Sequence, residues 1–182
     1  VVVGASSSAE AAWSVNLDGM VTGCDYSMRT RALVVSLTSE KIVRIEGEDG
    51  DTVVLRRLQV SPTAVTWNET GESVFVGTED GRILHLGTKG GPVAAVRAPI
   101  GSMVSTNGGR TVVVAAEERP LEAYDVASGR LVWSQPQVFA YAIRLDPVSE
   151  NQVVASPQSN SPTLVWIDGE SGRILRSIQI DD

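Results

Sequence analysis

The ten residues Asp125–Ser134 read DVASGRLVWS, and the ten residues Asp168–Ser177, which lie 43 positions further along, read DGESGRILRS. Both stretches place an acidic residue three positions before a Ser-Gly-Arg tripeptide, and an apolar run follows the tripeptide. The Ser-Gly pair is typical of a tight turn between strands, because glycine readily adopts the positive φ that such turns require. Similarity between segments at a fixed period of about 20–50 residues indicates a repeat fold.

Weaker copies of a second pattern, a short segment followed by an apolar run, occur along the chain. Successive copies lie 38 to 41 residues apart. They are Gly23–Ser27 with Leu33–Leu37, Ala64–Asn68 with Val74–Thr78, Met103–Asn107 with Val112–Ala116, and Ala142–Asp146 with Val153–Ala155. The sequence therefore repeats a unit of about 40 residues.

The composition is that of a folded globular domain of 182 residues, of which 42% are hydrophobic and 20% are charged. No apolar pattern of helical period persists over three turns, whereas short β-branched runs alternate with turn signals. Many short strands joined by tight turns predict an all-β sandwich, barrel or propeller. A period of about 40 residues that holds four strands favours the last of these, a β-propeller of four-stranded antiparallel blades.

Two stretches resemble the repeats of known propeller families. Val65–Ile83 looks like the first three strands of a WD40-type blade, and Tyr124–Trp133 resembles the repeat of quinoprotein-like propellers. In the latter family an Asp ends the third strand, a Gly turns the chain, and a Trp follows in the fourth strand. No repeat of this chain has the Gly-His opening or the Trp-Asp dipeptide of WD40 blades. The His–Ser–Asp–Trp network of regular WD40 blades is therefore not expected here.

The repeats divide the chain, as a single propeller region, into about four and a half blades. The segments are 1–18 as a partial blade, then 19–59, 60–98, 99–136 and 137–182. In the partial blade, Val1–Ala5 is expected to be a third strand and Ala11–Val15 a fourth, which aligns Trp13 with Trp133. Propellers typically have about four to eight blades, and seven is common in the families that these repeats resemble. Seven blades of this period would need roughly 280 residues, so we expect these blades to belong to a larger, seven- or eight-bladed propeller. A small closed propeller and an open arc are the alternatives.

The composition also argues against several classes of protein. A net charge of −7 and a pI near 4.7 disfavour nucleic-acid binding, which needs a basic surface. A single Cys and a single His exclude an internal disulfide and a zinc site built from several of these residues. No apolar run approaches the roughly 18 residues of a membrane span. No signal peptide is visible, which together with the single Cys favours an intracellular location, although the sequence leaves the compartment open.

Two reactive residue types are each better explained by packing than by chemistry. His85 has no catalytic partner near it in the sequence, and alternation places it opposite the face of Leu84 and Leu86. Cys24 is followed by Asp25, an acid that does not favour a reactive thiolate. We therefore expect Cys24 to be a small buried core residue.

No constellation for a cofactor is visible either. The tryptophans are spaced like the blades, which favours packing between blades over an aromatic ligand platform; they are Trp13, Trp67, Trp133 and Trp166. A quinone or calcium site needs carboxylates, amides and an Arg that converge at one end of the channel. The available carboxylates share no ligand spacing; they are Asp25, Asp80, Glu117, Asp146 and Asp168. The segment Gly87–Gly91 lacks the spacing of a phosphate-binding P-loop, so we expect no cofactor and no metal.

Two acidic pairs occupy equivalent positions in neighbouring repeats. Glu79-Asp80 and Glu117-Glu118 both fall between the expected second and third strands of a blade. In a propeller this connection shares one face with the links between blades, so the two pairs are expected to form a continuous negative rim. Such a rim steers a basic partner protein toward it. Glu79, Asp80, Glu117 and Glu118 are therefore the candidate partner-binding residues.

The function predicted from the sequence is that of a non-catalytic scaffold, a propeller that mediates protein–protein interaction as a subunit of a larger complex. We expect no enzyme activity, because no reactive constellation of residues is visible. The expected partners are other proteins, together with the remaining blades, from the parent chain or from a partner. The alternative is a quinoprotein-like enzyme or ligand-sensing propeller that holds a small molecule in its central channel.

Overall fold

The computed structural model describes residues 2–5, 11–87, 90–158 and 163–180. Strands account for more than half of the described residues, against roughly 20–25% in an average globular protein. Within the described ranges there is no α-helix, and one 3-10 turn covers Asn107–Gly109. The all-β prediction is confirmed. None of the described segments is a helix of the length and apolarity needed to cross a bilayer.

The strands form one two-stranded sheet and four four-stranded sheets, all antiparallel. The two-stranded sheet, the N-terminal hairpin, contains β1 (Val2–Ala5) and β2 (Ala11–Val15). Blade 1 contains β3 (Val21–Ser27), β4 (Ala32–Leu37), β5 (Lys41–Glu46) and β6 (Thr52–Arg57). Blade 2 contains β7 (Pro62–Trp67), β8 (Val74–Thr78), β9 (Arg82–Leu86) and β10 (Gly91–Ala95). Blade 3 contains β11 (Ile100–Thr106), β12 (Thr111–Ala116), β13 (Leu121–Asp125) and β14 (Leu131–Gln135). Blade 4 contains β15 (Ala140–Asp146), β16 (Ser149–Pro157), β17 (Thr163–Asp168) and β18 (Ile174–Gln179).

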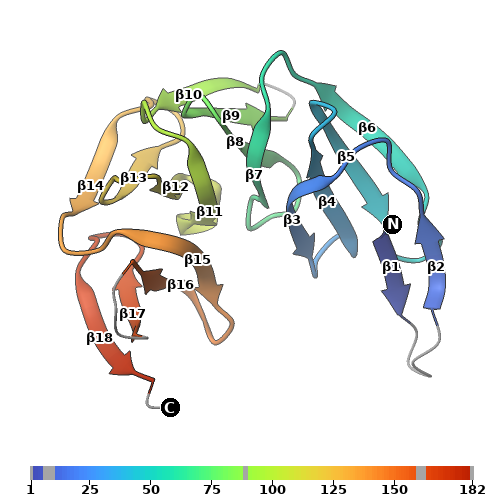
Figure 1. Ribbon diagram of the computed structural model, residues 1–182. Helices are drawn as coiled ribbons and strands as arrows, with labels where there is room; N and C mark the ends of the chain where they lie inside the picture. Colours follow the sequence, from blue (N-terminus) through green and yellow to red (C-terminus); the bar gives the residue numbers. More distant parts are fainter. Residues whose placement is uncertain (1, 6–10, 88–89, 159–162, 181–182) are drawn as a thin grey trace.

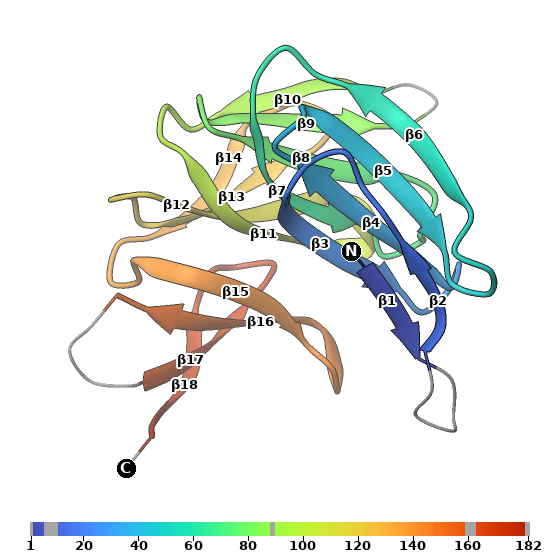
Figure 2. The same cartoon turned by 45° about the vertical axis from the view of Figure 1, so that its right-hand side comes forward.

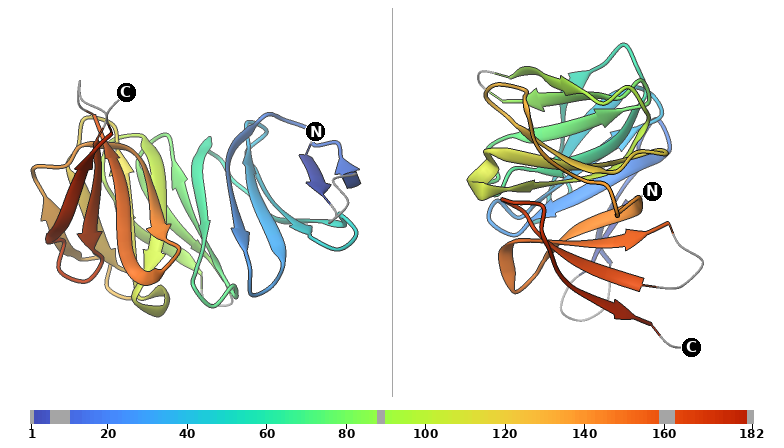
Figure 3. Two further views of the ribbon diagram at one scale, coloured as in Figure 1. Left: turned by 90° about the horizontal axis from the view of Figure 1, so that it is seen from below. Right: turned by 90° about the vertical axis from the view of Figure 1, so that its left-hand side faces the viewer.

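The four blades stand side by side in an arc (Figure 1). The first strand of each blade lies on the inside of the arc and the fourth on the outside, so strand order follows chain order in every blade. Neighbouring inner strands pack on one another, β3 on β7, β7 on β11 and β11 on β15. The N-terminal hairpin and blade 4 lie at opposite ends of the arc, as the turned views show (Figures 2 and 3).

Each inner strand carries a β-bulge near its start. The extra residue stands between two positions that pair with consecutive residues of the neighbouring strand, and in the four blades it is Thr22, Thr63, Gly101 and Tyr141. A bulge bends the strand and increases its twist. The repeat of this feature at the same place gives the four inner strands a common shape.

A side-chain hydroxyl also joins each inner strand to the next. The hydrogen bonds run from the hydroxyl of one blade to a backbone carbonyl of the following blade: Thr22 to Pro62 at 2.7 Å, Thr63 to Ile100 at 2.6 Å, and Ser102 to Ile143 at 3.2 Å. Between these contacts, apolar side chains from facing blades fill the junctions. The core is therefore divided into separate clusters, one at each junction.

Two junctions are closed by a tryptophan of an outer strand. Trp133 in β14 donates its indole N–H to the carbonyl of Gly169 at 3.1 Å, and its ring lies against Gly172 in the turn between β17 and β18. A Cβ atom at Gly172 would lie 2.6 Å from that ring, so only glycine fits. Trp13 in β2 repeats the arrangement on blade 1, where it donates to the carbonyl of Gly47 at 3.0 Å.

The junction between blades 2 and 3 is closed by backbone instead. Gly129, in the turn between β13 and β14, approaches β10 so closely that a Cβ atom would lie 2.1 Å from the carbonyl oxygen of Val93. Tyr124 packs into the same junction with Val93 and Val126. The aromatic ring and the close backbone contact leave no room for a tryptophan here.

The repeated Asp-x-x-Ser-Gly motif forms the turn between the third and fourth strands. Asp125 accepts hydrogen bonds from the backbone N–H of Ser128 at 2.8 Å and from its hydroxyl at 2.6 Å, and Gly129 takes a φ of 68°. Asp168 makes the same two bonds, at the same distances, with Ser171. The sequence repeat therefore encodes one turn geometry twice.

These turns predict an acid-sensitive fold. The hydrogen bond from the Ser171 hydroxyl lowers the pKa of Asp168, and the Ser128 hydroxyl does the same for the pKa of Asp125. A carboxyl group whose pKa is lower when folded contributes stability that is present above its unfolded pKa of 3.8 and lost as the pH falls through the folded value. We expect the free energy of unfolding to decline below about pH 4, and to decline less steeply in the double variant Asp125→Asn/Asp168→Asn. Urea unfolding across this range measures both slopes, and equal slopes contradict the prediction.

Candidate functional site

The two acidic pairs lie in turns on the same face of the arc. One pair occupies the turn between β8 and β9, and the other occupies the turn between β12 and β13. In both turns the first acidic residue donates its backbone N–H to a carbonyl of the link that enters the blade: Glu79 to Ser61 at 3.0 Å and Glu117 to Pro99 at 2.9 Å. Both turns therefore lie beside the links between blades.

Arginines interrupt the acidic surface on this face. The Arg82 guanidinium pairs with the Asp80 carboxylate at 2.8 Å, and Thr78 donates its hydroxyl to the same carboxylate at 2.6 Å. The hydrogen bond from Arg82 is the main reason that the pKa of Asp80 is lowered. Arg97 is exposed and lies next to the same turn, since a Cβ atom at Gly81 would be 2.8 Å from its backbone nitrogen. The acidic rim is therefore not continuous, because Asp80 is neutralised by its partner.

The other three candidates remain available to a partner. Glu79, Glu117 and Glu118 are exposed, and in the part of the chain that the structure describes none of them forms an ion pair within 4.0 Å. The neighbouring Arg119 is directed elsewhere, because it pairs at 3.1 Å with the buried Glu122. The pairing of Asp80 has a sequence signal, since an arginine two residues after an acid can reach back across a tight turn.

The inner strands form a second candidate region, the wall of the central channel. A cavity of about 470 Å³ opens there, and its lining includes Cys24, Arg29 and Arg144. Cys24 is exposed, so the prediction of a buried core residue is wrong. It pairs across the sheet with Val35 and so lies on the face of blade 1 turned away from blade 2. Trp13 and its neighbours in the N-terminal hairpin cover another part of that face.

The carboxylates near the channel hold the structure together. Asp25 accepts hydrogen bonds from the hydroxyl of Thr66 at 2.9 Å and from the backbone N–H of Trp67 at 2.8 Å, which ties blade 1 to blade 2. Asp146 accepts the indole N–H of Trp166 at 2.7 Å. Within the described ranges, no three His, Cys, Asp or Glu side chains are grouped so that they could hold a metal ion.

His85 lies on the side of β9 opposite Leu84 and Leu86, as alternation predicts. Its ring stacks on Phe75 with 4.8 Å between ring centres, and its Nε2 is 2.8 Å from the Ser73 hydroxyl. Burial lowers the pKa of His85, which favours the neutral ring. Leu84 and Leu86 pack instead against the cluster between blades 1 and 2.

No protein-family model matches the sequence, and a search of curated proteins finds no match. Solved structures do match. Hydrazine synthase of Kuenenia stuttgartiensis superimposes with a TM-score of 0.73 at 15% identity, over 91% of this chain and 51% of that one. The β-propeller domain of Cps50 (Swd1) from Myceliophteria thermophila superimposes with a TM-score of 0.76 at 11% identity, over 95% of this chain and 63% of that domain. The chain has a β-propeller fold.

The four blades form an open, partial propeller, and the chain spans about half of the hydrazine synthase chain and just under two thirds of the Cps50 domain. The computationally designed Ika4 protein is also similar, with a TM-score of 0.59 at 18% identity over 91% of this chain and 94% of that one. Identities of 11 to 18% establish the fold alone. The resemblance to propeller repeats seen in the sequence is thereby confirmed.

Proposed function

We propose that this chain is a non-catalytic scaffold, a propeller region that docks other proteins within a larger assembly. The observation that supports this function is apolar surface on the two blades that bound the arc. On blade 4 and its entry link the exposed side chains are Phe139, Tyr141, Val148, Leu175 and Ile178. On blade 1 and its entry link they are Met20, Val21, Tyr26, Met28, Val53, Val54 and Leu55. Val148 is 93% exposed and Met28 82%, and apolar surface of this kind marks contacts with other protein.

Further blades, from the parent chain or from a partner, fit these apolar surfaces. A partner protein with a basic surface fits the exposed glutamates, because charges of opposite sign speed the encounter of two proteins. In this proposal Glu79, Glu117 and Glu118 attract the partner, while Asp80 stabilises the turn between β8 and β9.

The triple variant Glu79→Lys/Glu117→Lys/Glu118→Lys tests the electrostatic part of the proposal. We expect the association rate with a basic partner, isolated by co-purification with the chain, to fall about tenfold or more at low salt. The difference should shrink as salt is added, because exposed charges are screened. The matched control is Glu48→Lys/Asp49→Lys/Glu170→Lys, which makes the same change of charge in turns of the opposite face. Equal losses in both triple variants contradict the assignment of these three glutamates.

A ligand in the central channel is the second candidate function, and the cavity lined by Arg29 and Arg144 supports it. A bound ligand stabilises the folded chain by mass action, so thermal unfolding in the presence of quinones and divalent metals tests it. A rise in Tm that Arg144→Ala abolishes supports the channel ligand. An unchanged Tm with every compound contradicts this candidate and leaves the scaffold proposal standing.

A further inference from the structure

The outer edge of blade 1 is formed by β6. Among the described strands only β5 pairs with it, so no strand lies along the other side of its backbone. All the residues of β6 are exposed, and its middle carries three apolar side chains in a row. Val53 is 52% exposed, Val54 49% and Leu55 37%. An open strand edge with exposed apolar side chains is a site for pairing with another strand.

The pairing with β5 shows which backbone groups of β6 face outward. The carbonyl of Asp51 accepts the N–H of Glu46 at 2.9 Å, so the backbone polar groups of Asp51 point toward β5. The register is regular from Thr52 to Val54, and successive residues of a strand direct these groups to alternate sides. The N–H and C=O groups of Thr52 and Val54 therefore point away from β5, where an added strand would meet them.

Proteins usually protect an open strand edge with charged residues, a β-bulge or a proline. β10 contains Pro92, which has no N–H group to donate. In β6 the protective features occur at one end only, where Leu55 is the extra residue of a bulge and Arg56 and Arg57 follow it. The stretch Thr52–Val54 is left open.

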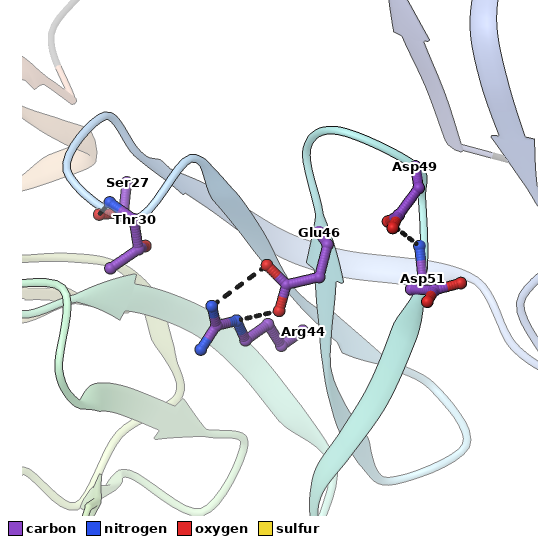
Figure 4. A network of polar contacts seen from close by, with 6 residues as sticks. All are labelled: Ser27, Thr30, Arg44, Glu46, Asp49 and Asp51. Carbon is purple, nitrogen blue, oxygen red and sulfur yellow. Dashed lines mark hydrogen bonds and ion pairs between the residues drawn. The ribbon is translucent and has the colours of Figure 1, made fainter.

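The two ends of β6 carry charges of opposite sign. Asp49 and Asp51 precede the strand (Figure 4), and Arg56 and Arg57 end it. None of these four residues forms an ion pair within 4.0 Å with another described residue. The other outer strands lack this pattern, since β10 and β14 contain no charged residue and β18 contains only Arg176.

The charged residues of the neighbouring strand β5 are already paired within the chain. Arg44 contacts Glu46 at 2.8 Å (Figure 4), and Lys41 pairs with Asp18. Two further acids lie near the arginine end of β6, but neither is within 4.0 Å of a guanidinium; they are Glu40 and Glu72. The charges at the two ends of β6 are therefore available to a partner.

We propose that β6 pairs with β6 of a second copy of this chain, antiparallel about a two-fold axis perpendicular to the sheet, so that two blades share one continuous sheet. Antiparallel pairing brings the acidic end of each copy to the basic end of the other, and an interface of two-fold symmetry has to be complementary to itself in this way. With Val53 on the axis, Thr52 lies opposite Val54 of the second copy, and their outward N–H and C=O groups bond to each other.

The same register brings opposite charges together on one side of the shared sheet. Val53 pairs with Arg44, and Arg44 and Arg56 line the same cavity, so Val53 and Arg56 lie on one side of blade 1. Asp51 lies on that side as well, because side chains two positions apart along a strand share a face. Asp51 of each copy therefore comes within reach of Arg56 of the other. Because β6 lies on the outside of the arc (Figure 1), the pairing leaves both ends of the arc open to further blades.

Sedimentation velocity of the unmodified chain, from about 10 μM to about 1 mM, measures the association. We expect a dimer with a Kd of about 10–100 μM, because an edge contact buries less area than a standard interface. Hydrogen exchange resolved by residue locates the contact. From the lowest to the highest concentration, exchange of the Thr52 and Val54 amides should slow about threefold or more, while exchange in β10 and β14 stays the same.

Two charge variants test the complementarity of the two ends. Arg56→Asp/Arg57→Asp has acids at both ends of β6, and Asp49→Arg/Asp51→Arg has arginines at both ends. Each variant alone should stay monomeric at about 1 mM, since like charges meet across the axis, whereas an equimolar mixture should form a heterodimer.

The matched control is Arg130→Asp/Arg173→Asp, which makes the same change of charge in turns of blades 3 and 4 and should dimerise like the unmodified chain. A chain that stays monomeric at about 1 mM overturns the proposal. A dimer that leaves the exchange of Thr52 and Val54 unchanged also overturns it, because the copies then meet elsewhere. A mixture of the two charge variants, each folded by circular dichroism, that associates no more than either alone overturns it as well.

If either charge variant fails to fold, the exchange measurement on the unmodified chain decides alone. The proposal is independent of the scaffold function, which is measured by the binding of a basic partner through Glu79, Glu117 and Glu118. These glutamates lie in turns of blades 2 and 3, so a chain that fails to dimerise can still bind that partner, and the reverse also holds.

Discussion

Replacing Trp133 with alanine is expected to destabilise the chain by about 3–5 kcal/mol, the usual cost of removing a large buried ring. The ring is 8% exposed and belongs to the apolar cluster that joins blades 3 and 4. Its loss leaves a cavity and deprives the Gly169 carbonyl of its hydrogen bond. Since each blade contacts only its neighbours, blade 4 should separate from the arc before the rest unfolds.

Equilibrium unfolding in guanidinium, with hydrogen exchange resolved by residue, measures both effects. Trp133→Phe keeps one aromatic ring but loses the pyrrole part of the indole together with its hydrogen bond, so it should cost less than Trp133→Ala, about 1–3 kcal/mol. Trp13→Ala, at a half-buried position, should cost about 1–2 kcal/mol and loosen only the N-terminal hairpin. A loss of less than about 1 kcal/mol for Trp133→Ala contradicts the packing role and favours an exposed aromatic platform.

Gly129→Ala is expected to cost about 2–5 kcal/mol, although it adds a single methyl group. Left-handed backbone costs a residue other than glycine roughly 1–2 kcal/mol, and Gly129 has a φ of 68°. The methyl group would also lie 2.1 Å from the carbonyl oxygen of Val93, which forces blades 2 and 3 apart. Overpacking of this kind costs about 1–3 kcal/mol more.

Gly108→Ala separates the two contributions. Gly108 has a φ of 65°, but a Cβ atom there meets nothing within 4 Å. It should therefore cost only the backbone strain, about 1–2 kcal/mol. Denaturant unfolding of the two variants under the same conditions gives the difference, and equal costs show that the contact between blades 2 and 3 contributes nothing to stability.

Much of the fold is visible in the sequence because strands, turns and repeats are local signals. The Asp-x-x-Ser-Gly motif predicts a turn, and the structure shows why the spacing matters, since Asp168 reaches both polar groups of Ser171. The alignment of Trp13 with Trp133 also has a structural counterpart, because both indoles donate to a glycine carbonyl of the next blade. Composition and periodicity were sufficient for these features.

Other features depend on how strands pair and how blade faces pack in the folded chain. No short stretch of sequence indicates either. The bulges at Thr22 and Tyr141 are set by pairing register, which the pattern of apolar residues does not specify. Cys24 has the small size of a core residue, but it lies on a blade face that is only partly covered.

The hydroxyl-to-carbonyl bonds between inner strands give the arc a polarity. In all three bonds the donor belongs to the earlier blade and the acceptor to the later one. The two ends of the arc are therefore chemically unlike. If two copies of the chain joined at the same end about a two-fold axis, donor would face donor or acceptor would face acceptor. A heterologous, head-to-tail contact matches donor to acceptor instead. A further blade that joined in the same rotational sense as the four already in place would preserve the direction of these bonds.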